Sequence, residues 1–306
     1  FLIGKADRRY KRFKWEVTKY QCDGMPYGLA PAPRLATKMM APVIRYLRSC
    51  GLRLAIYIDD LILLSRSYKE SIEHTQLLVD TLHSLGFGIH PDKCSVIPSR
   101  SAEFLGTQVN SRKMQFRVPR DKIRSTRREI RSVFSENEVG KLTVRKFCSL
   151  LGKLNALSGA VVSAQLHLWP LHHLMRQQLA RARYQDLMHL NSQVIEEMQW
   201  WHDEMHNWSG KAIISARCQM VVTTDASSHG WGAWWRPFGH SGKLQDEARG
   251  FWLPSEEGMS SNARELSGVK LTVKAGLAHS RDRVVLVETD PKVTQAYIHH
   301  MGGRAL

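Results

Sequence analysis

The sequence predicts a mixed α+β protein with several domains, and three observations indicate this class. Two short apolar runs surround a pair of aspartates within residues 54–65, residues 120–207 show mainly helical periodicity, and strand patterns with one helix follow after residue 218. A chain of 306 residues has room for two domains or for one large domain of several parts. Its hydrophobic content of 43% is enough to form a buried core.

The chain is strongly basic, with 44 Lys and Arg against 28 Asp and Glu and a formal net charge of +16. Such a charge favours polyanionic partners, with nucleic acid ahead of an anionic membrane surface. No apolar run is long enough to span a bilayer, and no signal-peptide pattern opens the sequence. The five cysteines are scattered without a C-x-x-C pair. They argue against a zinc site or a disulfide framework and indicate a reducing compartment, cytoplasm or nucleus.

The aspartate pair lies between two runs that are short and rich in Ile and Leu, at residues 54–58 and 61–64. Runs of this length suit buried strands better than helices, and Asp tolerates tight turns. We therefore expect a hairpin with Asp59 and Asp60 at its tip. Adjacent carboxylates repel each other and are stabilised by a divalent cation such as Mg²⁺, which prefers oxygen ligands. An ordinary solvated turn is the alternative reading.

Four stretches in order along the chain resemble the motifs of reverse transcriptases. YIDD at 57–60 resembles the Y-x-D-D box of the polymerase palm, and MPYGLAPAP at 25–33 resembles the LPFGL-x-x-AP segment. GFGIHPDKC at 86–94 resembles the motif that contains a lysine, and EFLG at 103–106 resembles the primer grip. The similarity is greatest to the DIRS-type (tyrosine-recombinase) retrotransposons, because a second domain further along the chain also fits that group.

The resemblance implies roles for single residues of the palm. Asp59 and Asp60 would be catalytic metal ligands, and Lys93 would lie near the triphosphate and protonate the leaving pyrophosphate, unless it is an ordinary surface lysine. The residues implied to bind nucleotide and template are Pro26, Tyr27, Gly28 and Tyr57, and those of the primer grip are Phe104, Leu105 and Gly106.

Two further segments are basic. In residues 1–22 the alternation of Phe13, Trp15 and Val17 with polar residues predicts a strand with one solvent face, either a sheet edge or a hairpin that contacts template phosphates. After Pro119 the periodicity predicts helices over residues 120–134 and 143–157. The first resembles a polymerase thumb, whose contacts to the nucleic-acid backbone would come from Arg124, Arg127 and Arg128. A solvated helix is the alternative.

The end of the chain contains a second set of acidic residues. A strand reaches Asp225, two further strands follow at 230–235 and 250–252, a helix from 261 to about 278 carries Glu265, and an apolar strand at 284–287 precedes Asp290. This β-β-β-α-β order, with the stretches TDASSHGWGAW, SNARELSGVKL and VETDPKVTQAYI, resembles ribonuclease H of the DIRS type.

The ribonuclease H resemblance implies that Asp225, Glu265 and Asp290 are the catalytic metal ligands. Glu288 is a rival to Asp290, two residues earlier in the strand. The family usually has Asn after the third acid, where this chain has Pro291, a residue that suits the first turn of a helix.

The predicted layout has four parts. They are a partial fingers and palm with an antiparallel sheet and helices (1–118), a helical thumb (119–159), a helical connection without assigned chemistry (160–217) and a truncated α/β ribonuclease H-like domain (218–306). The middle segment, residues 160–207, is expected to be helical with its tryptophans in the core. We expect the sequence to be a piece of a longer polyprotein, without the first palm aspartate and without the end of ribonuclease H.

The predicted function is RNA-directed DNA polymerase with ribonuclease H activity from a retrotransposon. It would use two Mg²⁺ ions per active site, with Mn²⁺ as a substitute. Expected partners are an RNA template, a DNA primer, the RNA–DNA hybrid, deoxynucleoside triphosphates and polyprotein neighbours such as a recombinase or integrase, and no membrane. Two alternatives remain open: a decayed or domesticated copy that binds RNA–DNA duplex without catalysis, and a nuclease with a vestigial polymerase scaffold.

Overall fold

The computed structural model describes residues 2–26, 28–239, 246–256, 258–276 and 283–301. The chain divides into two compact units, residues 1–105 and 106–306, and each is described by itself. The four-part division expected from the sequence stays a prediction. No helix in these ranges is both long and apolar enough to cross a membrane.

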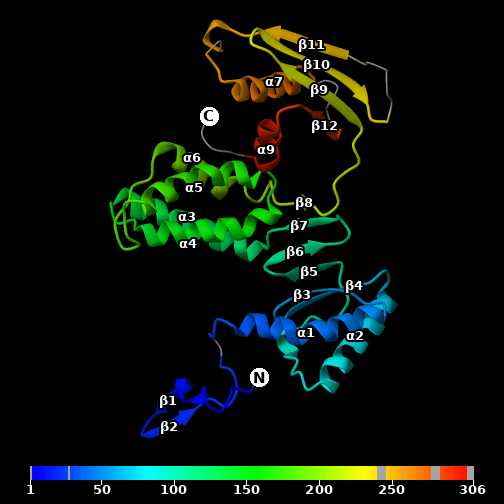
Figure 1. Ribbon diagram of the computed structural model, residues 1–306, viewed down its shortest axis with the longest axis vertical. Helices are drawn as coiled ribbons and strands as arrows, with labels where there is room; N and C mark the ends of the chain where they lie inside the picture. The colour runs from blue at the N-terminus through cyan, green and yellow to red at the C-terminus, as the bar shows by residue number, and fades with distance from the viewer. Residues whose placement is uncertain (1, 27, 240–245, 257, 277–282, 302–306) are drawn as a thin grey trace. The chain divides into compact units, whose positions relative to one another are not determined.

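Unit 1 combines two β-hairpins with two long helices (Figure 1). Its elements are β1 (Arg12–Trp15), β2 (Thr18–Gln21), α1 (Ala32–Ser49), β3 (Arg53–Tyr57), β4 (Asp60–Leu64), α2 (Tyr68–Ser84) and β5 (Ser101–Phe104), with 3-10 turns at Arg8–Lys11 and Pro91–Lys93. The first hairpin differs from the prediction of one strand with one solvent face: Val17 lies in the turn, and both faces of the ribbon are exposed.

The core of unit 1 forms where α1 and α2 pack against the β3–β4 hairpin. Its buried residues are Met40, Ile44, Leu47, Leu52, Leu54 and Leu82. Helical spacing in the sequence predicts a stripe that includes Leu35 and Met39, but Leu35 is half-buried and Met39 is 42% exposed. Val43 and Leu47, which the same spacing predicts, do pack in this core, so the prediction is right for the second half of the stripe, and Met40 and Ile44 take the place of Leu35 and Met39 in the rest.

The spacing of Ile72, Leu78 and Leu82 predicts a helix over residues 71–85, and α2 begins three residues earlier, at Tyr68. Its N-cap is Ser67, whose Oγ accepts a hydrogen bond from the Glu70 backbone N–H at 3.1 Å. The Glu70 carboxylate in turn accepts a bond from the Arg66 backbone N–H at 2.5 Å, and this bond is the main cause that lowers the Glu70 pKa. Ser-x-x-Glu is the sequence signature of a capping box, so the start of α2 was readable from the sequence.

The first part of unit 2 is a helical bundle beside a small antiparallel sheet. Its elements are β6 (Thr107–Asn110), β7 (Gln115–Arg117), α3 (Arg120–Glu138), α4 (Val144–Leu157), a 3-10 turn (Ser158–Ala160), α5 (Ala164–Leu179), α6 (Ser192–Asp203) and β8 (Lys211–Ala212). Strand β7 pairs with both β6 and β8. The predicted N-cap Thr143 is confirmed, since its Oγ accepts from the Lys146 N–H at 3.3 Å.

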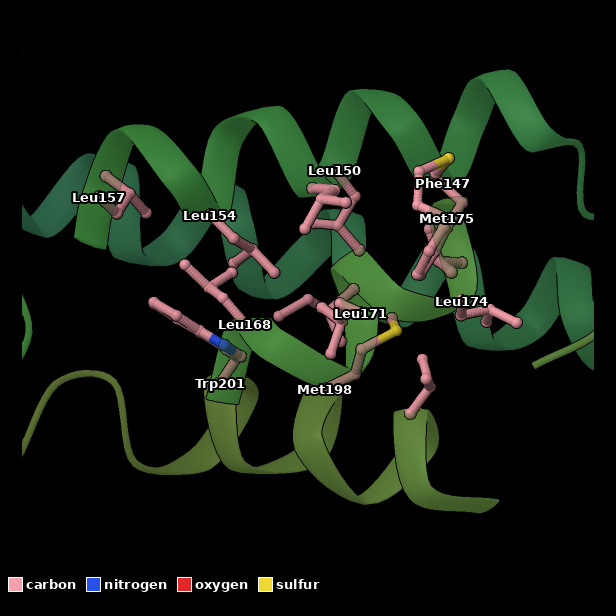
Figure 2. Close-up of a cluster of buried hydrophobic side chains, with 14 of the residues drawn as sticks. Phe147, Leu150, Leu154, Leu157, Leu168, Leu171, Leu174, Met175, Met198 and Trp201 are labelled. Carbon is pink, nitrogen blue, oxygen red and sulfur yellow. The ribbon is translucent and has the colours of Figure 1, made fainter. Parts of the chain in front are cut away.

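Helices α4, α5 and α6 enclose the largest apolar core. Figure 2 shows Phe147, Leu154, Leu171, Met198 and Trp201 converging from these helices. The prediction of one helical stretch over residues 160–207 is corrected to two helices. Asn191 caps α6, and the segment before it buries Met188 and Leu190. Apolar residues therefore continue through an irregular segment, which periodicity alone cannot distinguish from a helix.

The last part of unit 2 is a four-stranded sheet with a helix packed on it. Its elements are β9 (Met220–Ala226), β10 (Gly230–Pro237), β11 (Asp246–Phe251), a 3-10 turn (Pro254–Glu256), α7 (Ser261–Ala275), β12 (Val285–Glu288) and α9 (Lys292–His300). The strand order is β11-β10-β9-β12, antiparallel except for the parallel β9–β12 pair. The predicted β-β-β-α-β order is confirmed, although the expected helix end near residue 278 lies outside the described residues.

Candidate functional site

The aspartate pair lies where the sequence predicts it. Tyr57 pairs with Asp60 across the β3–β4 hairpin, which leaves Ile58 and Asp59 as a two-residue turn. Both carboxylates are exposed, and Tyr57 is 58% exposed. Paired residues project from the same face of a hairpin, so Tyr57 and Asp60 lie side by side. The expectation of a hairpin with both acids at its tip is confirmed.

Ile58 has an unusual backbone conformation, with φ of 60°. Asp59 does not share the positive φ, and the first position of a two-residue hairpin turn with a positive φ is normally Gly, Asn or Asp. For a β-branched residue a positive φ is a steric outlier. Strain of this kind is concentrated at functional sites. Nothing in the sequence indicates this feature, because turn chemistry disfavours Ile at a position with positive φ.

We expect Ile58→Gly to raise the free energy of unfolding by about 1 kcal/mol, because Gly adopts the positive φ without steric cost. The measurement is urea unfolding of both proteins. The matched control is Ile62→Gly, which removes the same half-buried side chain from the regular strand β4 and should be destabilising. Equal destabilisation by both changes would contradict the strain at Ile58.

The loop before α1 contains the residues expected to contact nucleotide and template. Pro26 is half-buried, and Gly28 is exposed with φ of 85°. A Cβ added at Gly28 would meet no atom within 4 Å, so backbone conformation and not crowding accounts for this glycine. Tyr27, the other residue expected here, lies outside the described residues.

Lys93 ends the 3-10 turn Pro91–Lys93 and is exposed, which leaves both readings of this lysine open. The residues expected to grip the primer form a turn after β5: Phe104 is half-buried, and Leu105 and Gly106 have φ of 48° and 71°. In unit 2 the Gly106 carbonyl accepts a hydrogen bond from Lys122 Nζ at 2.8 Å. A Cβ at Gly106 would meet that Nζ, the mobile end of a flexible side chain, so it is the positive φ and not crowding that favours glycine at this position.

The basic residues of α3 have two different roles in the structure. Arg127 Nε donates to the His202 carbonyl at 2.6 Å and its Nη2 donates to the Asp203 carbonyl at 3.1 Å. These carbonyls end α6, so Arg127 stabilises a helix C-terminus. Arg124 and Arg128 are exposed. The expectation of a backbone contact therefore rests on these two and not on Arg127.

The exposed arginines of α3 form one stripe. Arg120 and Arg131 are exposed like Arg124 and Arg128, and the four positions are spaced by four, four and three residues. Side chains at such spacing lie on the same face of a helix. The opposite face buries Thr126, Ile130 and Val133 in the bundle. The stripe thus presents only cations to solvent on a rigid, packed helix.

The second acidic group is brought together by the parallel β9–β12 pair and by α7. Thr223 is level with Glu288 in the strand register. The strand pairing ends there; Asp225 lies two residues further along β9, and Asp290 lies two residues after the end of β12. Glu265 lies on α7, which is held against β9 by a buried hydrogen bond between the hydroxyls of Thr224 and Thr272 at 2.9 Å.

The charges of this group interact. Glu265 is 8% exposed, whereas Asp225 and Asp290 are exposed. Burial, and then the negative charges of Asp225 and Asp290, raise the pKa of the Glu265 carboxyl above its usual value. The three predicted acids therefore share one electrostatic environment. We call them the acid triad.

The rival Glu288 is engaged elsewhere. Its carboxylate accepts a hydrogen bond from the Thr223 hydroxyl at 2.8 Å and forms an ion pair with Arg236 at 3.2 Å. Arg236 was not singled out by the sequence, since nothing in the pattern shows that β10 carries a cation within reach of Glu288. Pro291, at the N-cap of α9, has φ of −72°, so it fits the start of that helix as expected.

The donor chemistry of both acidic groups fits hard divalent cations, which prefer carboxylate oxygens. Asp59 and Asp60 would contribute at the hairpin tip, and the acid triad would contribute in the sheet. Within the described residues no three His, Cys, Asp or Glu side chains stand close enough together to chelate a metal ion. The acid triad is nevertheless close enough for its charges to raise the Glu265 pKa, and a bound cation would offset that repulsion.

We expect Glu265→Gln to raise the thermal unfolding midpoint above pH 7. Because the folded-state pKa is raised, ionised Glu265 destabilises the fold. Protonation of Glu265 stabilises the fold fully below the pKa that this residue has in the unfolded chain. That stability is lost as pH rises through the higher pKa that it has in the folded protein. The unfolding midpoint should rise by roughly 2–4 °C for each kcal/mol of relieved repulsion and burial cost. The difference between variant and parent should vanish near pH 4, where Glu265 is protonated in both states.

The control for this prediction is Glu288→Gln, which removes the favourable Arg236 and Thr223 contacts and should not stabilise the protein. Thermal scans from pH 4 to pH 8 without divalent cations measure both variants. A Glu265→Gln variant that is less stable than the parent at pH 8 would contradict the electrostatic account of the triad.

Residues 3–109 match the family model described as reverse transcriptase (RNA-dependent DNA polymerase). The matched segment contains the β3–β4 hairpin with Asp59 and Asp60, the loop before α1, Lys93 and the turn at Leu105 and Gly106. The sequence resemblance is thus confirmed for this segment at the level of the domain. The family match does not distinguish the DIRS-type group from other reverse transcriptases.

Three solved structures of foamy viral protease-reverse transcriptase have similar folds. The complex with dsDNA has a TM-score of 0.57 at 15% identity, over 97% of this chain and 58% of that one. A form named dRH, in complex with dsDNA, has a TM-score of 0.59 at 16% identity, over 100% and 50%. The complex with an RNA/DNA hybrid has a TM-score of 0.57 at 16% identity, over 100% and 39%.

At these identities the likeness is one of fold. It covers nearly the whole chain, including the parts that follow residue 109, so the mixed α+β architecture as a whole is like that of reverse transcriptase structures. The chain spans between 39% and 58% of the length of these proteins.

Proposed function

We propose that this chain carries an RNA-directed DNA polymerase and a ribonuclease H from a retrotransposon of the DIRS type. The observation that supports this most strongly is the exposed Asp59–Asp60 pair on a strained hairpin, inside the segment that matches the reverse transcriptase family. The four-part layout of palm, thumb, connection and ribonuclease H-like domain belongs to the same proposal. Its substrates are an RNA template, a DNA primer and deoxynucleoside triphosphates.

In the proposed polymerase site, Asp59 and Asp60 hold divalent cations, with Asp59 as the direct ligand and Asp60 as a weaker ligand or a nearby charge. When bound, the cations stabilise the charge that develops on the attacking and leaving oxygens. The hairpin fixes both acids on a packed support, which is what catalysis by positioning requires. Pro26, Tyr27, Gly28 and Tyr57 line the nucleotide and template, and Lys93 donates a proton to the leaving pyrophosphate.

In the proposed nuclease site, the acid triad holds divalent cations next to the RNA strand of a hybrid. The cations, when bound, activate water and stabilise the leaving oxygen. Glu265 is held by α7, and its burial and the nearby charges of Asp225 and Asp290 raise its pKa. A carboxyl group whose pKa is raised by burial and by neighbouring acids is common at functional sites. Mg²⁺ is the proposed ion at both sites, with Mn²⁺ as a substitute.

The proposed duplex contact is the arginine stripe of α3. Foamy viral relatives of this fold are in complex with dsDNA and with an RNA/DNA hybrid, and the net charge of +16 favours the same class of partner. Contacts from exposed arginines to phosphates position a duplex without reading its sequence. The turn at Phe104, Leu105 and Gly106 would contact the primer end.

We expect the double change Arg124→Glu and Arg128→Glu to weaken binding to RNA–DNA hybrids of any sequence by roughly tenfold or more. The slope of log affinity against log salt should also fall, by about 0.9 for each lost phosphate contact on B-form DNA and somewhat differently on a hybrid. Fluorescence anisotropy across a salt series measures both.

Arg127→Ala is the matched control, because its guanidinium binds the end of α6. It should lower the free energy of unfolding by about 1–2 kcal/mol and leave the hybrid affinity of the folded protein unchanged. A salt-independent affinity, or a stronger loss of binding in Arg127→Ala than in the double variant, would contradict the assignment of the stripe.

A further inference from the structure

The hairpin β1–β2 carries its aromatic residues on one face. Phe13 pairs with Tyr20 and Trp15 pairs with Thr18, so these side chains project from the same face. The rings of Phe13 and Tyr20 are stacked, with centroids 5.5 Å apart and planes 19° apart. All eight strand residues are exposed, Trp15 to 67%. The aromatic face is therefore open to a partner.

The other face of the hairpin is basic. Lys14 lies directly opposite Lys19, and Arg12 lies opposite Gln21. Like charges at paired positions destabilise a hairpin, and an isolated two-stranded ribbon is only marginally stable. Residues 5–19 contain seven lysines and arginines against two acidic residues. A polyanion bound to this face would offset the repulsion between the two lysines.

We propose that the β1–β2 hairpin is a binding platform for single-stranded nucleic acid. Unpaired bases stack on the face formed by Phe13, Trp15 and Tyr20, and the strand continues around an edge of the two-stranded ribbon, so that the phosphates of its next nucleotides contact Arg12, Lys14 and Lys19 on the opposite face. Aromatic stacking combined with basic contacts to the backbone is how proteins bind single strands with little sequence preference. The inference rests on the proposed function only in naming the natural ligand, the single-stranded part of the template.

Duplex does not fit this platform as well as a single strand. The bases of a double helix are stacked on one another, so their faces are not available to an aromatic side chain, whereas unpaired bases are free to stack on it. The arginine stripe of α3 is the proposed contact for duplex, and the β1–β2 hairpin is the proposed contact for the unpaired strand. The two surfaces should therefore respond to different nucleic acids.

The test measures anisotropy of labelled dT15, rU15 and a blunt 20-base-pair RNA–DNA hybrid with the 1–306 chain. Trp15→Ala should weaken binding to dT15 and to rU15 by about 5- to 150-fold, and it should change the affinity for the hybrid by less than about twofold. Trp15→Phe should retain most of the affinity. Lys14→Gln with Lys19→Gln should lower the single-strand salt slope by about 1.4, which corresponds to two phosphates.

Tyr68→Ala is the matched control, an exposed aromatic at the start of α2 that should change neither affinity. Circular dichroism should be unchanged in all variants, because no strand residue of the hairpin is buried. The proposal is overturned if Trp15→Ala leaves the single-strand affinity unchanged, if it weakens hybrid equally, or if it instead dissociates an oligomer of the chain. Failure of the parent protein to bind the RNA–DNA hybrid would count against the proposed function and not against the single-strand binding platform.

Discussion

Asp59→Asn abolishes primer extension on an RNA template, with an expected loss of about a thousandfold or more. The reason is that Asn removes the negative charge from the group proposed as the direct cation ligand, at the exposed tip of the β3–β4 hairpin. Asp60→Asn should lose less extension activity, since Asp60 is the proposed weaker ligand of the pair. The measurement is single-turnover extension by the protein that carries residues 1–306 in their native sequence context.

Hybrid binding is the control for this prediction. Asp59→Asn should leave hybrid affinity within about twofold of the parent, because the proposed duplex contacts come from the arginine stripe of α3 and not from the hairpin tip. Ile58→Gly is a second control that changes the same turn without removing a carboxylate. Robust extension by Asp59→Asn would show that the aspartate pair is an ordinary solvated turn, the alternative that the sequence left open.

Asp225→Asn, Glu265→Gln and Asp290→Asn each abolish metal-dependent cleavage of the RNA strand of a hybrid. The expected loss is again about a thousandfold or more. The three acids lie in one electrostatic environment and act as a unit, so double variants should lose little more than single ones. Cleavage of an end-labelled RNA strand in the native sequence context measures each variant.

Glu288→Gln is the matched control in the same strand, since its carboxylate is bound by Thr223 and Arg236. It should keep most of the cleavage activity. If Glu288→Gln were inactive while Asp290→Asn kept its activity, Glu288 and not Asp290 would be the third ligand.

The Asp59–Asp60 hairpin and the order of elements along the chain after residue 218 were predictable because local rules govern them, whereas the order of the strands within the sheet was not predicted. Short Ile- and Leu-rich runs around Asp59 and Asp60 leave few structures other than a hairpin, and each strand of the last sheet ends close to a turn signal. The family resemblance then supplied chemistry that spacing alone does not carry. The capping box of Ser67 and Glu70 is also visible in the sequence. It is the signal from which the start of α2 at Tyr68 could have been predicted.

Other features depend on tertiary contacts that the sequence does not display. Arg127 looks like its neighbours Arg124 and Arg128 in a one-dimensional pattern, but packing of α3 beside α6 places it at two free carbonyls. The irregular segment that buries Met188 and Leu190 has the composition of a helix core. The positive φ of Ile58 contradicts turn preferences, and local rules fail most often at strained or functional positions.

One assay tests the central claim that a single chain contributes to both DNA synthesis and RNA degradation. An RNA template labelled at one end is annealed to a DNA primer with a second label, and both products are followed with and without Mg²⁺ in the native sequence context. The account predicts that the parent protein extends the DNA and shortens the RNA, that Asp59→Asn only shortens the RNA, and that Asp225→Asn only extends the DNA. Tight binding of the hybrid with neither product at any Mg²⁺ concentration would contradict it and would identify a non-catalytic duplex-binding copy.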